Sequence, residues 1–269
     1  MKDFFKDKVV VITGGSEGIG KALIDTLIPM GAKIATCGRN QDKLYNLQVQ
    51  YSNHLLHAIV ADVSRYDDCR HFIESTIQTF GGIDILINNA GISMRALVQD
   101  ADISVLRSVM EVNFFGTVYC TKLALNSILE RKGAIVGISS IAGYRGLPGR
   151  SGYSASKFAV NGWLEALRTE LLDTGTHVMW VCPGFTTSNI RNVALDEHGR
   201  TSGESKMDEQ DMMPAAECAT HILQAIAAKK RTLILTFTGK RTVWLNKLVP
   251  GLADRMVRNF FFKDQKLVK

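Results

Sequence analysis

A β-branched run that ends in a glycine-rich turn constrains the fold of this 269-residue chain more than any other stretch. Residues 8–13 read Lys-Val-Val-Val-Ile-Thr, which is typical of a parallel strand buried on both faces. Gly14, Gly18 and Gly20 follow, and apolar residues then recur at helical spacing over 19–30. Such a turn can hold a pyrophosphate against the free N–H groups of a helix N-terminus. A loop without a ligand is the alternative, but the position between strand and helix favours a nucleotide cofactor.

Apolar runs and helical patterns alternate along the rest of the chain. The further strands are predicted at 33–37, 55–61, 83–87, 134–138, 176–181 and 232–237. The longer helices are predicted at 66–80, 102–130, 152–172 and 214–228. This alternation predicts an α/β fold of the Rossmann type, with a doubly wound, seven-stranded parallel sheet flanked by helices. Because 46% of the residues are hydrophobic and no linker separates the elements, we expect a single domain.

The composition excludes several classes of protein. The five cysteines are scattered without paired spacing, which argues against a disulfide framework or a zinc site and predicts a reducing compartment and no metal. Residues 1–7 contain no apolar stretch of the kind found in signal peptides, and no apolar run is long enough to span a membrane. We therefore expect a cytoplasmic protein that is neither exported nor integral to a membrane.

A stretch in the middle of the chain carries the candidate chemistry. Tyr153 and Lys157 are four residues apart in a helical pattern, so their side chains lie on one face. A phenol has a pKa of about 10, and a neighbouring ammonium favours the phenolate and lowers that value. Ser140 follows the predicted strand 134–138, so its hydroxyl is expected at the carboxyl edge of the sheet, where open α/β sheets bind ligands. For Tyr153 and Lys157 taken alone, the alternative to a catalytic pair is a tyrosine in the core next to a lysine on the surface.

Ser140, Tyr153 and Lys157, together with Asn113 and the glycine turn, resemble the classical short-chain dehydrogenase/reductase family over residues 7–238. The resemblance implies reversible hydride transfer between a nicotinamide and a carbonyl carbon. Tyr153 would be the proton donor in reduction, and Ser140 would orient the carbonyl. Lys157 would lower the pKa of Tyr153 and bind the nicotinamide ribose. Asn113 would hold a water of the proton relay, although a tolerated surface asparagine is the alternative.

Arg39 follows the second predicted strand, where an acidic residue would bind the ribose of NAD and an arginine would accommodate the 2′-phosphate of NADP. NADP(H) is therefore the predicted cofactor, with NAD as the alternative. Glu17 complicates this prediction, because many NADP-using relatives have a basic residue there. Asp62 could equally cap a helix. The resemblance implies cofactor contacts from Gly14, Ser16, Gly18, Ile19, Gly20, Arg39, Asp62, Val63, Asn89, Ala90, Gly91, Tyr153, Lys157, Pro183, Gly184, Thr186 and Ser188.

The chain after the last motifs changes character twice. Residues 189–213 are polar and without periodicity, and they fall where the family has its substrate lid. We predict a catalytic domain over 1–238 and a basic amphipathic extension over 239–269, which has eight basic and two acidic residues and so carries the whole net charge of +6. Its apolar residues recur at helical spacing, which fits either an interfacial helix on a membrane or a helix packed on protein. No nucleic-acid motif is present, and no such partner is expected.

The predicted function is an NADP(H)-dependent oxidoreductase acting on a carbonyl or secondary alcohol. The basic amphipathic extension favours a lipid-like ketone, and the layout is similar to the 3-ketodihydrosphingosine reductases, so a 3-keto sphingoid base is one candidate substrate. A small soluble ketone and a non-catalytic nucleotide-binding role are the alternatives. A homodimer or homotetramer, formed through the long helices, is implied by the resemblance.

Overall fold

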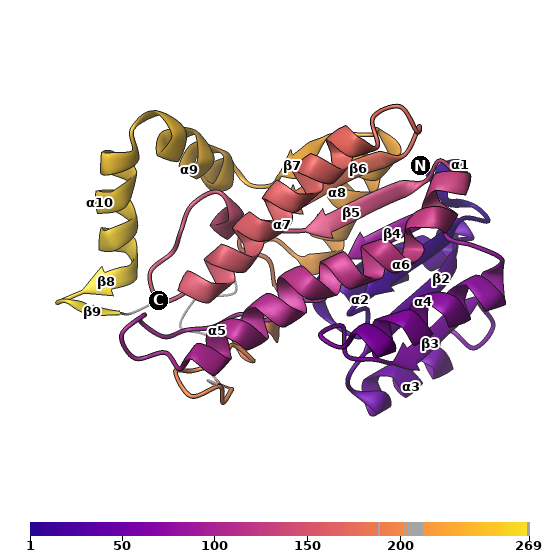
Figure 1. Cartoon of the computed structure of the whole chain (residues 1–269), viewed down its shortest axis with the longest axis horizontal. Helices are drawn as coiled ribbons and strands as arrows, with labels where there is room; N and C mark the ends of the chain where they lie inside the picture. Colours follow the sequence, from indigo (N-terminus) through magenta and orange to yellow (C-terminus); the bar gives the residue numbers. More distant parts are fainter. Residues whose placement is uncertain (188, 202, 204–211, 268–269) are drawn as a thin grey trace.

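The computed structural model describes residues 1–187, 189–201, 203 and 212–267. Its strands are β1 (Val9–Thr13), β2 (Lys33–Gly38), β3 (Leu56–Val60), β4 (Ile85–Asn88), β5 (Ala134–Ile138), β6 (His177–Cys182) and β7 (Thr232–Ile234). They form one seven-stranded sheet in the order β3-β2-β1-β4-β5-β6-β7, in which every neighbouring pair is parallel (Figure 1). The predicted doubly wound α/β fold is confirmed.

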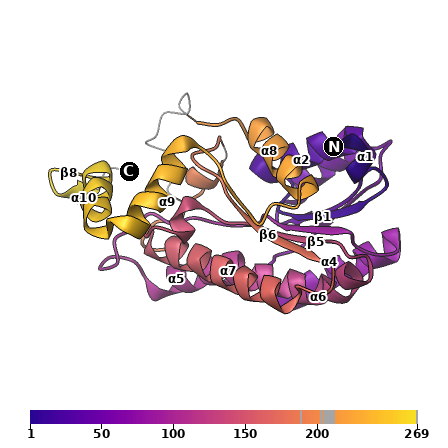
Figure 2. The same ribbon diagram turned by 90° about the horizontal axis from the view of Figure 1, so that it is seen from above.

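Helices cover both faces of the sheet. They are α1 (Lys2–Phe5), α2 (Gly18–Leu27), α3 (Gln41–Gln50), α4 (Tyr66–Phe80), α5 (Ile103–Met110), α6 (Gly116–Glu130), α7 (Ser151–Glu170) and α8 (Ala215–Ala227). Figure 2 shows α2 and α8 on one side of the sheet and α4, α6 and α7 on the other. Alternate residues of β1 join the two cores: Val10 and Ile12 pack with α2 and α8, and Val11 packs with α4 and α6. Burial on both sides explains the uninterrupted apolar run.

The strand order reverses between β1 and β4. The chain first moves outward through β2 and β3 and then returns to place β4 on the other side of β1. The connections after β1 and β4 therefore leave in opposite directions and open a crevice at the carboxyl edge of the sheet. Ligands bind at such a switch point in open α/β sheets.

Two predicted elements differ from the structure. The helix predicted over 102–130 is interrupted by a π-helical segment, Glu111–Phe115, between α5 and α6. The strand predicted over 232–237 is wrong in its second half, because β7 ends at Ile234. Thr236 has a φ of 64°, which cannot continue a strand, and its hydroxyl accepts a hydrogen bond from the Gly239 N–H. This threonine caps the next helix.

The C-terminal segment forms two helices, α9 (Phe237–Leu248) and α10 (Pro250–Phe261), followed by a hairpin of β8 (Phe262–Lys263) and β9 (Lys266–Leu267). Figures 1 and 2 show it extending beyond the carboxyl edge of the sheet as an arm. Arg145 ties the arm to the body, since its guanidinium donates to Asn246 and pairs with Asp254. No helix among the described residues is long and apolar enough to cross a bilayer.

Candidate active site

The carboxyl ends of β1, β4, β5 and β6 open into one cavity of about 1160 Å³. The glycine turn after β1 lines its cofactor end, and Tyr153 and Lys157 of α7 line its centre. Side chains of α9 and α10 close the far end. The cavity therefore connects the turn, the candidate catalytic residues and the C-terminal arm.

The glycine turn has the backbone that a pyrophosphate site requires. Gly14 has a φ of 68°, a conformation that side chains rarely allow. A Cβ on Gly20 would lie 2.3 Å from the Gly14 carbonyl oxygen and 2.6 Å from the Asn89 amide nitrogen. The first residue of α2 is Gly18, and the Glu17 side chain does not cap the helix, so the first N–H groups remain free for an anion.

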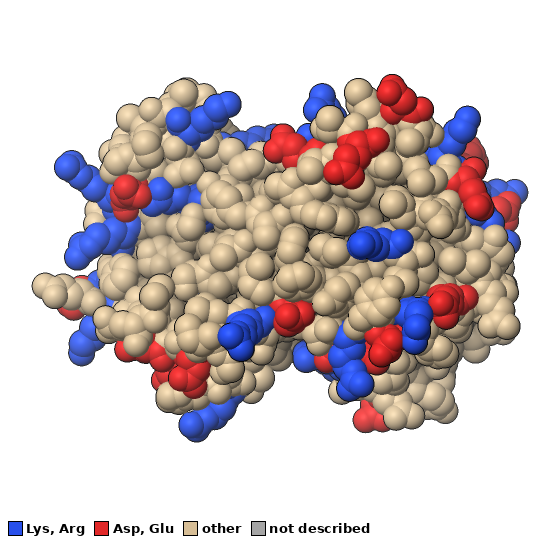
Figure 3. Space-filling view, viewed as in Figure 1, with Lys and Arg blue, Asp and Glu red and all other residues tan. Residues whose placement is uncertain are grey.

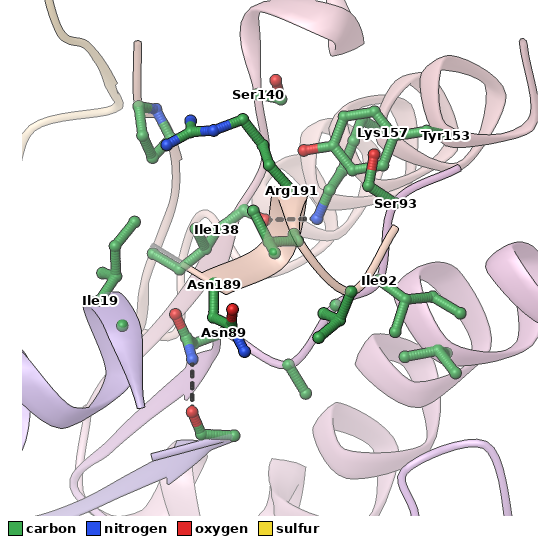
Figure 4. A pocket seen from close by; sticks show the side chains of 18 of the residues that line it. Ile19, Asn89, Ile92, Ser93, Ile138, Ser140, Tyr153, Lys157, Asn189 and Arg191 are labelled. Atoms are coloured by element: carbon green, nitrogen blue, oxygen red, sulfur yellow. Dashed lines mark hydrogen bonds between the residues drawn. The ribbon is translucent and has the colours of Figure 1, made fainter. Parts of the chain in front are cut away.

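Asn89 joins the end of β4 to the glycine turn. Its side-chain nitrogen donates to the carbonyl oxygens of Thr13 and Gly14 at 2.9 and 3.0 Å (Figure 4). The hydroxyl of Thr13 in turn accepts hydrogen bonds from the backbone N–H groups of Asn89 and Ala90. These four bonds hold the two strands together at the switch point, and Gly91 continues the same wall of the cavity.

The adenosine end of the cavity is lined by Arg39, Asp62 and Val63, with Ser16 and Ile19 of the turn close by. Arg39 is exposed, and no described residue forms an ion pair or side-chain hydrogen bond with its guanidinium. The Asp62 carboxylate accepts bonds from the Ser64 N–H and hydroxyl, as expected of a residue that also stabilises its own turn.

The negative charge of Glu17 would repel a phosphate at the adenosine end, and Lys43 lies close enough to offset it. The Lys43 ammonium pairs with the Glu17 carboxylate, and both side chains are more than four-tenths exposed. The negative charge at the edge of the turn is therefore largely compensated, and Arg39 keeps its own charge for a ligand.

Ser140, Tyr153 and Lys157 line the centre of the cavity (Figure 4). The Lys157 ammonium lies 5.7 Å from the centre of the Tyr153 ring and donates to the Ile138 carbonyl oxygen at 2.8 Å. The Ser140 hydroxyl accepts a bond from the Ala142 N–H at 3.1 Å. The helical spacing of the pair and the end of β5 therefore bring the predicted residues together, as the sequence suggested.

The surroundings move the pKa values of these residues in opposite directions. Burial raises the pKa of the Tyr153 phenol, and the hydrogen bond with Ser140 and the charges of Arg150 and Arg191 lower it. Burial lowers the pKa of Lys157 to about 8. Lys157 is thus mostly charged at neutral pH and loses its charge in mildly alkaline solution.

Asn113 lies in the π-helical segment and is almost fully buried. Its amide accepts from the Ile92 N–H at 2.8 Å and donates to the Ile92 carbonyl at 3.0 Å and to the Ser156 hydroxyl at 2.9 Å. These bonds connect the chain after β4 to α7, directly beside Lys157. A buried asparagine with three partners is a structural part of the site, and the surface alternative is wrong for it.

The turn after β6 forms the opposite wall. Pro183, Gly184 and Thr186 line the cavity, and the Thr186 hydroxyl donates to the Gly184 carbonyl oxygen at 3.3 Å. Ser188 lies outside the described residues, as do residue 202 and residues 204–211 of the predicted lid. The described part of that lid contributes a short 3-10 helix, Asn189–Arg191, which also lines the cavity.

Sequence reasoning missed two arginines and the role of α10 in this cavity. Arg150 and Arg191 are 9% and 6% exposed, both line the cavity, and the charge of each lowers the pKa of Tyr153. Arg150 precedes α7 and lies outside the predicted helix 152–172, and nothing in the sequence singles out Arg191 either. The apolar wall from α10 consists of Met256, Val257, Phe260 and Phe261.

A family model described as short chain dehydrogenase matches residues 8–198, well over half of the chain. The chain belongs to the short-chain dehydrogenase/reductase family. It is 35% identical over 273 residues to the dehydrogenase/reductase SDR family member 7B of Mus musculus, covering 98% of this chain and 84% of that protein. It is 31% identical over 267 residues to an SDR family protein 7-like of Dictyostelium discoideum, covering 95% of this chain and 82% of the other.

The fold has solved counterparts in the family. The crystal structure of a short-chain dehydrogenase/reductase from Burkholderia phymatum in complex with NAD matches with a TM-score of 0.82 and 22% identity, over 92% of this chain and 95% of that one. As a family member, this chain is an oxidoreductase that uses a nicotinamide cofactor. Among the described residues, no group of three potential ligands could hold a metal ion.

Proposed function

We propose that this chain is an NADP(H)-dependent reductase of a ketone carried by a lipid-like molecule. The observation that carries the proposal is one continuous cavity. It runs from Arg39 past Tyr153 to the apolar side chains of Met256, Phe260 and Phe261 on α10. A polar reaction centre with an apolar far wall suits a carbonyl attached to a hydrocarbon chain.

The mechanism follows from the positions of the side chains. The nicotinamide, when bound, supplies the hydride that reaches the carbonyl carbon. Ser140 orients the carbonyl by donating to its oxygen, and Tyr153 gives its phenolic proton to that oxygen, so the product is a secondary alcohol. Lys157 holds positive charge beside the phenol. Asn113 holds α7 to the segment after β4 through its hydrogen bonds with Ser156 and Ile92.

The preference for NADP(H) rests on charge at the adenosine end. A 2′-phosphate is an anion that a guanidinium binds in a planar, bidentate way. Arg39 is exposed, lines the cavity and is not paired within the described residues, while Lys43 compensates Glu17.

The lipid-like substrate is supported by the arm. Phe260 stacks on Phe185 with ring centres 6.4 Å apart at the cavity wall, while Trp244, Leu248 and Leu252 of the same arm are 62%, 57% and 49% exposed. Lys and Arg side chains gather at the α10 end of the molecule in Figure 3. Exposed apolar residues among cations suit the surface of an anionic membrane, from which such a substrate could enter.

Consumption of NADPH and NADH, followed by absorbance, tests the reaction. We expect NADPH to be consumed with long-chain keto-lipids in mixed micelles and not with short soluble ketones. Tyr153→Phe should abolish turnover while cofactor affinity stays within about twofold, and Tyr45→Phe, at an exposed phenol, is the matched control. Normal turnover of Tyr153→Phe would overturn the mechanism, and turnover of soluble ketones alone would overturn the lipid substrate.

Sedimentation with vesicles tests the membrane surface separately. The double variant Trp244→Ala, Leu248→Ala should lose binding to phosphatidylserine vesicles but keep cofactor binding. Leu172→Ala, which removes an exposed leucine (73%) on the body, should bind as the wild type does. No binding of the wild type to these vesicles would leave the arm as a wall of the cavity only.

A further inference from the structure

We infer that Arg150 is a second cation of the proton-transfer site and stabilises the Tyr153 phenolate that forms when the proton leaves. The inference rests on the proposed role of Tyr153 and adds a residue that the sequence pattern does not single out. Four observations on the described residues support it: the place of Arg150 in the fold, its burial, its lack of a carboxylate partner and the behaviour of Lys157.

The fold holds Arg150 next to Tyr153. Arg150 is the residue before the first turn of α7, and its carbonyl accepts a bond from the Ser154 N–H at 2.8 Å. A second tie comes from the segment between β4 and α5, where the Ala96 N–H donates to the Gly149 carbonyl at 2.9 Å. Only residues 151 and 152 separate Arg150 from Tyr153, and both side chains line the cavity.

The Arg150 side chain is buried without a matching anion. It is 9% exposed, its Nε has no hydrogen-bond partner, and no described carboxylate forms an ion pair with it. Buried arginines are ordinarily paired, because removing a guanidinium from water is costly. The negative charge that the reaction itself creates in this cavity is the phenolate of Tyr153.

Several charged and titratable groups act on the phenol together with Arg150. Besides Arg150, they are the Ser140 hydroxyl after β5, the Cys182 thiol at the end of β6, and Arg191 from the 3-10 helix, while the charges of Arg95 and Arg191 lower the pKa of Arg150. Burial lowers the pKa of Arg150 and raises the pKa of the phenol, and each shift is partly offset by the charge of the other group, so the two groups favour each other's charged forms.

Lys157 alone would be an unreliable source of charge. Its ammonium is already bonded to the Ile138 carbonyl, and burial brings its pKa to about 8. A guanidinium stays protonated far above that pH. Arg150 therefore keeps a positive charge beside Tyr153 under alkaline conditions in which Lys157 becomes neutral.

The step balances without another reactant. In reduction, the Tyr153 O–H bond breaks and an O–H bond forms on the substrate oxygen, while the electron pair remains on the phenolate oxygen beside Arg150. In oxidation, the same phenolate takes the proton of the alcohol. Arg150 donates no proton; it acts through Tyr153, so it is a positioning residue of the reaction.

Titration of Tyr153 by tyrosinate absorbance tests the inference on the full chain saturated with oxidised cofactor. Each variant is compared with the same variant carrying Tyr153→Phe, so that the difference reports one phenol. Arg150→Met should raise the midpoint by about one pH unit, which is about tenfold in proton affinity, and Arg150→Lys should restore most of it. Arg107→Met, at an exposed arginine of the same cavity, should leave the midpoint unchanged.

The pH profile of alcohol oxidation should move by the same amount. An unchanged midpoint in Arg150→Met would overturn the inference. So would a raised KM with a fixed midpoint, because Arg150 would then bind an anionic group of the substrate. Arg150→Gln provides the same comparison if the methionine variant does not fold. Since the titration needs no carbonyl substrate, its outcome is separate from failure of the proposed reductase activity.

Discussion

Replacement of Arg39 by alanine should convert a preference for NADPH into near-equal binding of the two nicotinamide cofactors. Arg39 follows the last residue of β2, lines the cavity and is exposed. No described residue forms an ion pair with it. Lys43 cannot take over its role without giving up the pair with Glu17. The variant removes the guanidinium and leaves the backbone after β2 and the glycine turn in place.

The size of the effect follows from the bonds that are lost. Hydrogen bonds to charged groups contribute about 1.5–3 kcal/mol, and an exposed site belongs near the lower end. A loss of about 2 kcal/mol corresponds to about a 30-fold weaker Kd for NADPH. NADH has no 2′-phosphate, so its Kd should change by less than about threefold.

Isothermal titration calorimetry with each cofactor measures both constants. Arg231→Ala, which removes an exposed arginine before β7 and outside the cavity, is the control and should alter neither. An equal loss of affinity for NADPH and NADH would show that Arg39 supports the fold of this edge. No loss for NADPH would refute the assignment of Arg39 to the 2′-phosphate.

Three further predictions follow from single contacts. Gly20→Ala should weaken cofactor binding at least about tenfold, because its Cβ would meet the backbone of Gly14, whereas Gly162→Ala has open space and should add up to about 1 kcal/mol to the unfolding free energy. Urea titration of Asn113→Ala should show a loss of about 2–4 kcal/mol, since buried partners of its amide remain unsatisfied, and a loss below about 1 kcal/mol would contradict this. Because burial lowers the pKa of Lys157 from 10.5 to about 8, the unfolded chain binds more protons than the folded chain between these two pH values. The wild type should therefore gain stability relative to Lys157→Met as the pH rises through this window, by no more than about 3 kcal/mol. A stability difference between the two proteins that does not change with pH would contradict this prediction.

The sequence pattern predicts the sheet well because each strand is buried on both faces. Continuous apolar runs such as 134–138 have no alternative to the interior, and glycine at the first turn fixes the direction of the chain that follows. The register of Tyr153 and Lys157 on one helical face was likewise readable, since it needs only the helical repeat. The hydrogen bonds from Asn89 to the glycine turn were not predicted, because the resemblance named Asn89 only as a cofactor contact.

Contacts between distant segments were not readable in this way. The end of β7 is decided by the positive φ of Thr236, which no local propensity favours for a threonine. Arg191 reaches the cavity through the fold of the segment after β6, and α10 becomes a wall because Arg145 holds the arm. Such placements depend on tertiary packing, which overrides local preference.

The π-helical segment Glu111–Phe115 makes this helix intolerant of a change in length. Each residue of an α-helix rotates the following residues by about 100° around the helix axis. A π-helical turn contains one extra residue, so the α-helix after it keeps its orientation. Loss of one residue here would let α5 run straight into α6 but would rotate the buried side of α6, including Cys120 and Ala124, away from the sheet. It would also carry the Asn113 amide away from Ile92. One deletion would thus disturb the core and the candidate catalytic site together.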